Sequence, residues 1–238
     1  MVIRKLTYPL LIALLASSFS ACGQQKNDGY SSKVASKYGT GKVYMGREIA
    51  AVMSFDGVDW LERSSRMQEE QTALAIKNLP IGKKSVVADV GAGSGFYTFK
   101  IAERVPDGKV YAVEIQDDAI AYLQQKSKDL KLNNVAVVKG SATGPKLPKQ
   151  AIDLVIMVDV YHELEHPKAF LEAIKVALKP GGKLLLLEYK AEDPNVRIKA
   201  EHKMSVAQVQ RELGASGYHL VQKSDFLPLQ HFLVFEKD

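Results

Sequence analysis

The chain contains only one cysteine and one tryptophan among its 238 residues. Because Cys22 has no second cysteine to pair with, an intrachain disulfide is excluded, and so is cysteine catalysis in the folded part of the chain. Long apolar runs are also missing: the longest, centred on residues 10–16, falls short of the roughly 20 residues that a membrane-spanning helix needs.

A concentrated charge of one sign is absent as well. The formal net charge is +5, and Arg4 and Lys5 contribute two of these charges. Lysines are dispersed along the remainder, with no basic stripe interleaved with aromatic residues. This distribution argues against a nucleic-acid partner, and we expect none.

The N-terminus has the pattern of a secretory signal. Arg4 and Lys5 precede the short apolar run, and small residues then lead to Cys22. The string Phe19-Ser20-Ala21-Cys22 resembles a bacterial lipoprotein cleavage box, with Phe19 where leucine is usual. The resemblance implies lipidation of Cys22 and a periplasmic-side envelope location. A simple cleaved signal and an uncleaved anchor are the alternatives.

Residues 86–102 combine a buried strand, a glycine-rich turn and a helix start. Residues 86–90 form a short apolar run typical of a strand covered on both faces, and apolar residues recur at helical spacing from Phe96 onward. Between them, Gly91, Gly93 and Gly95 permit positive φ and a close approach of backbone amides to a ligand. This pattern predicts a nucleotide-type site.

The glycine spacing distinguishes between cofactors. A dinucleotide-binding turn has its third glycine at the position that Phe96 occupies, which weakens the NAD interpretation. The string D-x-G-x-G-x-G from Asp89 resembles the first motif of class I S-adenosyl-L-methionine (SAM) methyltransferases. The LKPGG string before the strand at residues 183–189 resembles the same family. The DVYHEL segment at residues 159–164 resembles a similar segment in a group of bacterial class I methyltransferases.

The resemblance implies a Rossmann-like, three-layer α/β sandwich. Its seven-stranded, mostly parallel sheet would end in an antiparallel C-terminal hairpin, here residues 218–238. It also implies SAM as cofactor. Carried over by position, the cofactor-binding residues are Asp89, Gly91, Ala92, Gly93, Gly95, Glu114, Ile115, Ser141, Ala142 and Asp159.

Individual residues in that set have chemical reasons to bind SAM. Glu114 ends the strand after the glycine turn, where a carboxylate can accept hydrogen bonds from both ribose hydroxyls. Ser141 stands where the family often has an acidic residue facing adenine. Asp159 is expected to contact the methionine portion.

Residues 162–166 match H-E-x-x-H, the signature of zinc metalloproteases. That chemistry needs one continuous helix, whereas His162 follows a strand directly and Pro167 favours an extended His166. We therefore expect no metal. Tyr161 and His162 are instead candidate catalytic residues that orient the acceptor or take its proton. The alternative is that residues 162–163 hydrogen-bond loop backbone.

Two segments before the glycine turn, residues 43–53 and 59–79, have helical patterns. In related methyltransferases such a segment covers the cofactor. Trp60, Arg63 and Arg66 could contact the ligand, or could simply pack and face solvent.

The predicted organisation is a signal peptide at 1–21, a flexible tether at 22–42 and a class I methyltransferase domain at 43–238. We expect a monomeric SAM-dependent methyltransferase whose acceptor is a small molecule, a lipid-associated compound or a protein at the envelope. The alternative is a non-catalytic envelope lipoprotein that keeps the fold as a binding or accessory module. Translation from Met45 would instead give a cytoplasmic enzyme.

The anchor prediction can be tested by replacing Cys22 with alanine. We expect the full-length wild type to sediment with membranes and Cys22→Ala to appear in the soluble or secreted fraction, because the acyl chains are lost. Fractionation with immunoblotting measures this. Identical distribution of the two proteins would contradict the lipid anchor.

Overall fold

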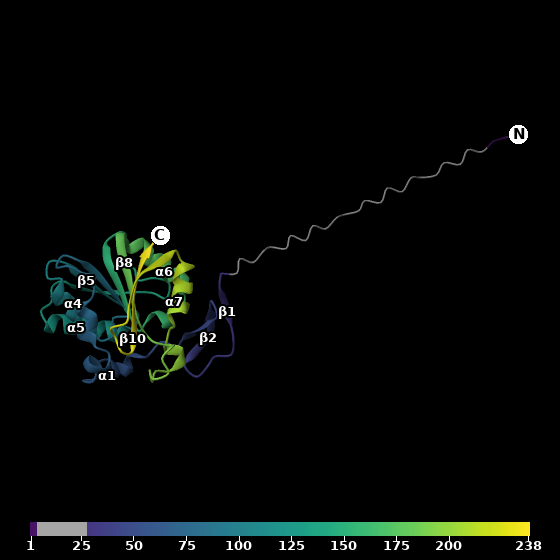
Figure 1. Ribbon diagram of the computed structural model, residues 1–238. Coiled ribbons are helices and arrows are strands. Elements are labelled where there is room, and N and C mark those ends of the chain that lie inside the picture. Colours follow the sequence, from purple (N-terminus) through teal and green to yellow (C-terminus); the bar gives the residue numbers. More distant parts are fainter. Residues whose placement is uncertain (4–27) are drawn as a thin grey trace.

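The computed structural model describes residues 1–3 and 28–238 (Figure 1). Cys22 and nearly all of the predicted signal peptide lie outside the described residues. Within the described ranges, no helix is both long enough and apolar enough to cross a membrane.

A seven-stranded sheet forms the centre of the protein, in the order β6-β5-β4-β7-β8-β10-β9. Neighbours from β6 to β8 pair in parallel, whereas β10 is antiparallel to both β8 and β9. The strands are β4 (Val86–Val90), β5 (Lys109–Glu114), β6 (Val135–Lys139), β7 (Ile152–Val158), β8 (Leu178–Tyr189), β9 (Tyr218–Ser224) and β10 (Gln230–Lys237). The predicted fold class is confirmed.

Helices cover both faces of this sheet. The helices are α3 (Thr72–Lys77), α4 (Phe96–Arg104), α5 (Asp117–Asp129), α6 (Pro167–Ala177) and α7 (Val206–Gly214). One apolar core joins α6 and α7 to the sheet, and a second joins α3 and α4 to its other face. Leu123 of α5 packs on this second side, against Phe99 of α4. Burial of both faces explains the continuous apolar character of the central strands.

Local sequence signals set several helix ends. Ser205 caps α7, because its hydroxyl accepts a hydrogen bond from the Gln208 N–H at 3.1 Å. Pro167 occupies the first position of α6, where a missing N–H costs no hydrogen bond. Both features follow from local capping rules.

Ordered structure begins well before the predicted domain start at Val43. Three short strands form a separate antiparallel sheet: β1 (Tyr30–Ser32), β2 (Gly39–Tyr44) and β3 (Arg47–Ala50). The prediction of a flexible tether is therefore wrong for residues 30–42, and the predicted helix over 43–53 is a hairpin instead.

Two features of the chain explain this small sheet. Met45 and Gly46 both have positive φ, 47° and 91°, which fits a tight turn between paired strands and not a helix. The carboxylate of Glu48 accepts hydrogen bonds from the Ser36 and Gly41 N–H groups, so polar residues at 36–41 have a fixed partner. The polar composition of residues 22–42 predicted a flexible tether, because composition alone does not show that Glu48 binds this segment.

The small sheet docks on the main domain through Arg47. Its guanidinium makes two hydrogen bonds to the buried Glu212 carboxylate of α7, at 2.8 and 2.9 Å. It also donates to the backbone carbonyl of His162 at 2.9 Å. In Figure 1, β1 and β2 accordingly lie beside α7.

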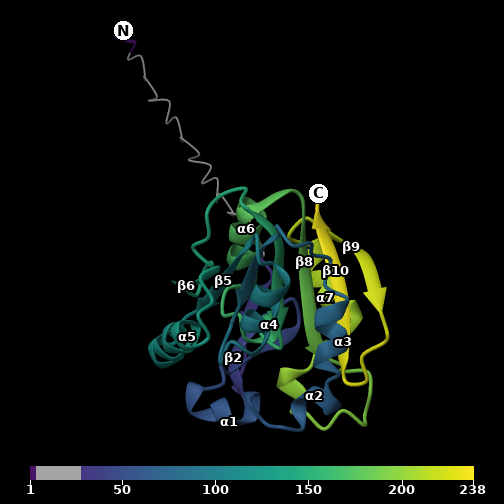
Figure 2. The same cartoon turned by 90° about the vertical axis from the view of Figure 1, so that its left-hand side faces the viewer.

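The predicted helical segment 59–79 is broken into short pieces. These are α1 (Val58–Leu61), α2 (Arg66–Glu69) and α3, and a 3₁₀ helix, η1 (Phe55–Gly57), directly precedes them. Gln71 has a φ of 53°, a left-handed conformation that ends α2 before α3 begins. Figure 2 shows α1 and α2 below the sheet, at the end opposite the C-terminus, where the parallel strands have their carboxyl ends.

Replacing Arg47 with alanine tests the docking of the small sheet. We expect the free energy of unfolding to fall by about 3 kcal/mol, because Glu212 would stay buried without its cationic partner. Lys139→Ala is the matched control, since its ion pair with Asp117 is exposed and should contribute less than about 1 kcal/mol. Urea denaturation measures both, and equal losses would contradict the docking account.

Candidate active site

A cavity of about 680 Å³ opens at the carboxyl ends of β4, β5, β6 and β7. This is the edge at which parallel α/β sheets bind ligands, and the volume suits a nucleotide-sized molecule. Of the predicted site residues, seven of the cofactor set and one of the catalytic pair line it: Gly91, Gly93, Glu114, Ile115, Ser141, Ala142, Asp159 and His162.

The glycine turn forms one wall. Gly91, Gly93 and Gly95 have φ values of 70°, 53° and 76°, so all three use the conformation that other residues rarely adopt. A Cβ at Gly91 would come within 2.5 Å of Val160, and one at Gly93 within 2.9 Å of Leu61 in α1. The turn therefore needs glycine for both backbone conformation and space.

Glu114 is tied to this turn. Its carboxylate accepts hydrogen bonds from the Gly93 N–H at 3.0 Å, from the Ile115 N–H at 2.6 Å and from the Gln116 N–H at 3.1 Å. The side chain is buried yet lines the cavity. Ile115 leaves about half of its surface exposed there, at 47%. Glu114 and Ile115 thus place a carboxylate and an apolar side chain next to each other in the cavity lining.

Asp89, Ala92 and Gly95 do not line the cavity. The Thr98 hydroxyl donates to Asp89 at 2.6 Å, which ties β4 to α4. Burial raises the pKa of Asp89 to about 6, although this hydrogen bond favours the charged form. Ala92 packs in the core beside Phe99. These residues, which the sequence predicted to contact the cofactor, instead belong to the packed structure around the glycine turn.

Asp159 follows β7 with a φ of 55°, a strained conformation for a non-glycine residue. Its side chain is partly buried, and one carboxylate oxygen accepts a hydrogen bond from Gln230 at 2.7 Å. The other oxygen is buried without a hydrogen-bond partner. Burial, together with the charges of Glu70 and Glu188, raises the pKa of Asp159 well above its usual range.

The two predicted catalytic residues lie in different places. Tyr161 is fully buried beneath the cavity wall, and its hydroxyl donates to Glu212 at 2.9 Å. The structure thus gives Tyr161 a packing position and no contact with the cavity. His162 does line the cavity.

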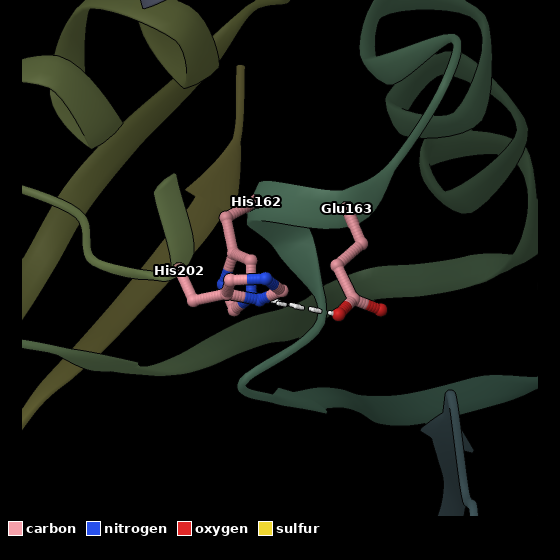
Figure 3. Close-up of side chains that lie close together, drawn as sticks. All are labelled: His162, Glu163 and His202. Atoms are coloured by element: carbon pink, nitrogen blue, oxygen red, sulfur yellow. Dashed lines mark hydrogen bonds and ion pairs between the residues drawn. The ribbon is translucent and has the colours of Figure 1, made fainter. Parts of the chain in front are cut away.

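His162 belongs to a buried polar chain. Its Nδ1 donates to Glu188 at 2.6 Å, and the same carboxylate accepts the Tyr161 N–H at 2.9 Å. Burial alone would lower the pKa of His162, but the charge and hydrogen bond of Glu188 outweigh it and raise that pKa. Figure 3 shows Glu163 and His202 near His162.

The H-E-x-x-H string is not a helix. Tyr161–Glu163 forms a short 3₁₀ helix, η2, and His166 is outside the helical conformation, with a φ of −128° and a ψ of 64°. The His166 Nδ1 lies 3.1 Å from the Lys42 Nζ, away from His162. The continuous helix that a metalloprotease requires is absent from this segment, as predicted from Pro167.

The N-terminal pieces close the cavity from the side opposite the sheet. Trp60 and Arg66 line it, whereas Arg63 stacks on Trp60 with 3.7 Å from its guanidinium carbon to the ring centroid. Both arginines pair with the buried Glu70, Arg63 at 2.7 Å and Arg66 at 3.0 Å. Trp60 and Arg66 can therefore contact a ligand in the cavity, whereas Arg63 serves in packing.

Comparison with known proteins shows that residues 81–232 match a family described as "Methyltransferase domain". This match covers more than half of the chain. The chain belongs to that methyltransferase domain family. Membership implies SAM as the cofactor of the cavity described above.

Individual relatives support the assignment of this methyltransferase domain. A crystal structure of a SAM-dependent methyltransferase from Aquifex aeolicus is 28% identical, with a TM-score of 0.72 over 77% of this chain and 98% of that one. Demethylmenaquinone methyltransferase of a Geobacillus strain is 30% identical over 112 residues, 47% of each chain. A probable cobalt-precorrin-6B C(15)-methyltransferase of Methanocaldococcus jannaschii is 34% identical over 108 residues, 45% of this chain and 50% of that one. The chain thus spans about half the length of these two curated relatives.

Several cavity residues had no usable sequence signal. His202, in the 3₁₀ helix η3 (Ala200–His202), follows His162 by 40 residues, and no sequence pattern pairs the two histidines. Lys37 and Tyr38 fall in the predicted tether but line the cavity. Only the fold brings these segments together.

The raised pKa of Asp89 predicts a pH-dependent stability. An aspartate in the unfolded chain has a pKa of about 3.9, so the folded protein holds its proton to higher pH. The contribution of Asp89 to stability therefore falls as pH rises from about 4 to about 6, and is constant above. Relative to Asp89→Asn, the wild type should lose about 2 kcal/mol of unfolding free energy between pH 4 and pH 7.

Denaturant titrations of both proteins across that pH range measure the difference. Parallel stability curves for the wild type and Asp89→Asn would contradict the buried, proton-holding Asp89.

Proposed function

We propose that this protein is a SAM-dependent methyltransferase acting on a small-molecule, lipid-associated or protein acceptor at the cell envelope. The observation that carries the proposal is the junction of the glycine turn with Glu114 in one cavity, within a methyltransferase domain. When bound, SAM supplies a methyl group already activated on a sulfonium sulfur.

The cavity residues fit the parts of that cofactor. Glu114 is fixed by three backbone N–H groups and can accept hydrogen bonds from the ribose hydroxyls. Gly91 and Gly93 leave room for the chain beside them. Ile115 offers an apolar face for adenine, and Ser141 with Ala142 borders the same region.

Asp159 suits the positively charged end of the cofactor. One of its oxygens lacks a hydrogen-bond partner, so an ammonium group would satisfy it. A cation there would also offset the repulsion from Glu70 and Glu188 that raises the Asp159 pKa. Gln230 holds the side chain in place.

The rest of the cavity is suited to an acceptor with both apolar and anionic parts. Its apolar lining includes Met53, Leu164 and Phe170, while the exposed basic residues Lys37 and Lys199 lie at its mouth. His162 faces this space and is the predicted catalytic residue that we retain. Holding acceptor and methyl group in line supplies much of the rate acceleration in such transfers.

Calorimetric titration with SAM tests the proposal. We expect the wild type to bind SAM and its demethylated product S-adenosylhomocysteine, and not NAD, since Phe96 replaces the third glycine of a dinucleotide turn. Gly93→Arg should abolish binding because the side chain fills the space beside Leu61. At a ligand concentration of about 100 times Kd, the wild type should gain about 2.7 kcal/mol of stability.

Gly82→Arg is the matched control. Gly82 has open space around its Cβ position and lies outside the cavity, so its substitution should leave SAM binding unchanged. A folded wild type that binds no SAM, or equal binding by Gly93→Arg and wild type, would contradict the proposal. The first result would favour a non-catalytic binding module.

A further inference from the structure

Three potential metal ligands meet in the cavity wall after β7. His162 and Glu163 come from η2 after β7, and His202 comes from η3, far along the chain (Figure 3). The His162 Nε2 lies 3.1 Å from the His202 Nδ1 and 3.9 Å from the Glu163 Oε1, and the His202 Nδ1 lies 3.4 Å from that same oxygen. All three residues line the cavity.

The Nδ1 side of the His162 ring contacts Glu188 at 2.6 Å. Glu188 is fully buried, and its carboxylate can only accept the hydrogen bond from Nδ1. This hydrogen bond places a proton on Nδ1, so Nε2, which lies 3.1 Å from the His202 Nδ1, is the ring nitrogen that can bind a metal ion. A carboxylate that orients a histidine in this way is the usual support of a metal-binding imidazole.

The separations of the three atoms, 3.1, 3.4 and 3.9 Å, lie on both sides of the spacing that a common metal ion imposes on its ligands. Ligand atoms about 2.0–2.2 Å from a tetrahedral zinc ion lie roughly 3.3–3.6 Å from one another. The two contacts of the Glu163 oxygen, at 3.4 and 3.9 Å, are longer than ordinary hydrogen bonds to imidazole. That carboxylate is instead steadied by the Met53 N–H at 3.2 Å.

We propose that His162, Glu163 and His202 bind one divalent transition-metal ion, with zinc as the first choice. Two imidazoles and one carboxylate form a ligand set used by catalytic zinc and by non-haem iron, both of which keep open positions. The negative charges of Glu163 and Glu188 would balance the ion. The open position faces the cavity.

This placement gives the ion a role that rests on the proposed methyltransferase function. An acceptor hydroxyl or thiol bound at the open position would lose its proton more readily, because a metal ion lowers the pKa of such groups. The metal would thereby replace His162 as the activator of the acceptor. The class of acceptor indicated is one that carries an oxygen or sulfur nucleophile.

Calorimetric titration with zinc alone, without SAM, tests the site. The full chain carries Cys22→Ser in every sample, so that its only thiol cannot bind the metal. We expect one zinc ion per chain, and at least 100-fold weaker binding in His202→Ala and in Glu163→Gln. Cobalt(II) substitution should give the intense visible absorption of a tetrahedral site in the parent protein only.

His166→Ala is the matched control, because His166 belongs to the H-E-x-x-H string but not to the cluster. It should bind zinc as the parent does. Glu188→Gln should weaken binding by about 10–100-fold, as expected for loss of a supporting carboxylate.

Absence of stoichiometric zinc binding in the parent would overturn the proposal. Equal losses in His166→Ala and His202→Ala would also overturn it. SAM binding measured in the same variants separates this result from the proposed function, since His202→Ala should still bind SAM.

Discussion

The cavity depends on hydrogen bonds that join the glycine turn to the neighbouring strand. The Gly91 and Ala92 N–H groups donate to the Val113 carbonyl, and the Gly93 N–H donates to the Glu114 carboxylate. These bonds curl the chain back toward β5 before α4 begins. Without them, the turn would have no fixed position relative to Glu114, and the ribose contact that we propose would not be preorganised.

The cavity wall that follows β7 is fixed in the same way by a different strand. Glu188 at the end of β8 accepts the Tyr161 N–H and the His162 Nδ1–H, and so fixes the loop that follows β7. In both walls, a buried carboxylate at a strand end holds the backbone of an adjacent turn. One wall thereby presents glycine backbone to a cofactor, and the other presents His162 to the cavity.

Sequence patterns predicted the parts of this arrangement that depend on short-range chemistry. The parallel strands, the Pro167 helix start and the Ser205 cap follow from apolar runs and local capping rules. Asp89 was assigned to the cofactor by its place in the family motif and Tyr161 to catalysis by its chemistry, yet their partners Thr98 and Glu212 draw both side chains inward. Pairings such as Arg47 with Glu212, or His162 with His202, join residues from distant parts of the chain and leave no local pattern.

The most direct measurement is a crystal structure of the protein grown with S-adenosylhomocysteine. We expect the nucleoside to lie beside the glycine turn. Both ribose hydroxyls should be within hydrogen-bond distance of the Glu114 carboxylate, and the amino group should lie near Asp159. Ligand bound elsewhere, or bound in the cavity with Glu114 turned away from the ribose, would contradict the proposal that the glycine turn and Glu114 form the SAM site.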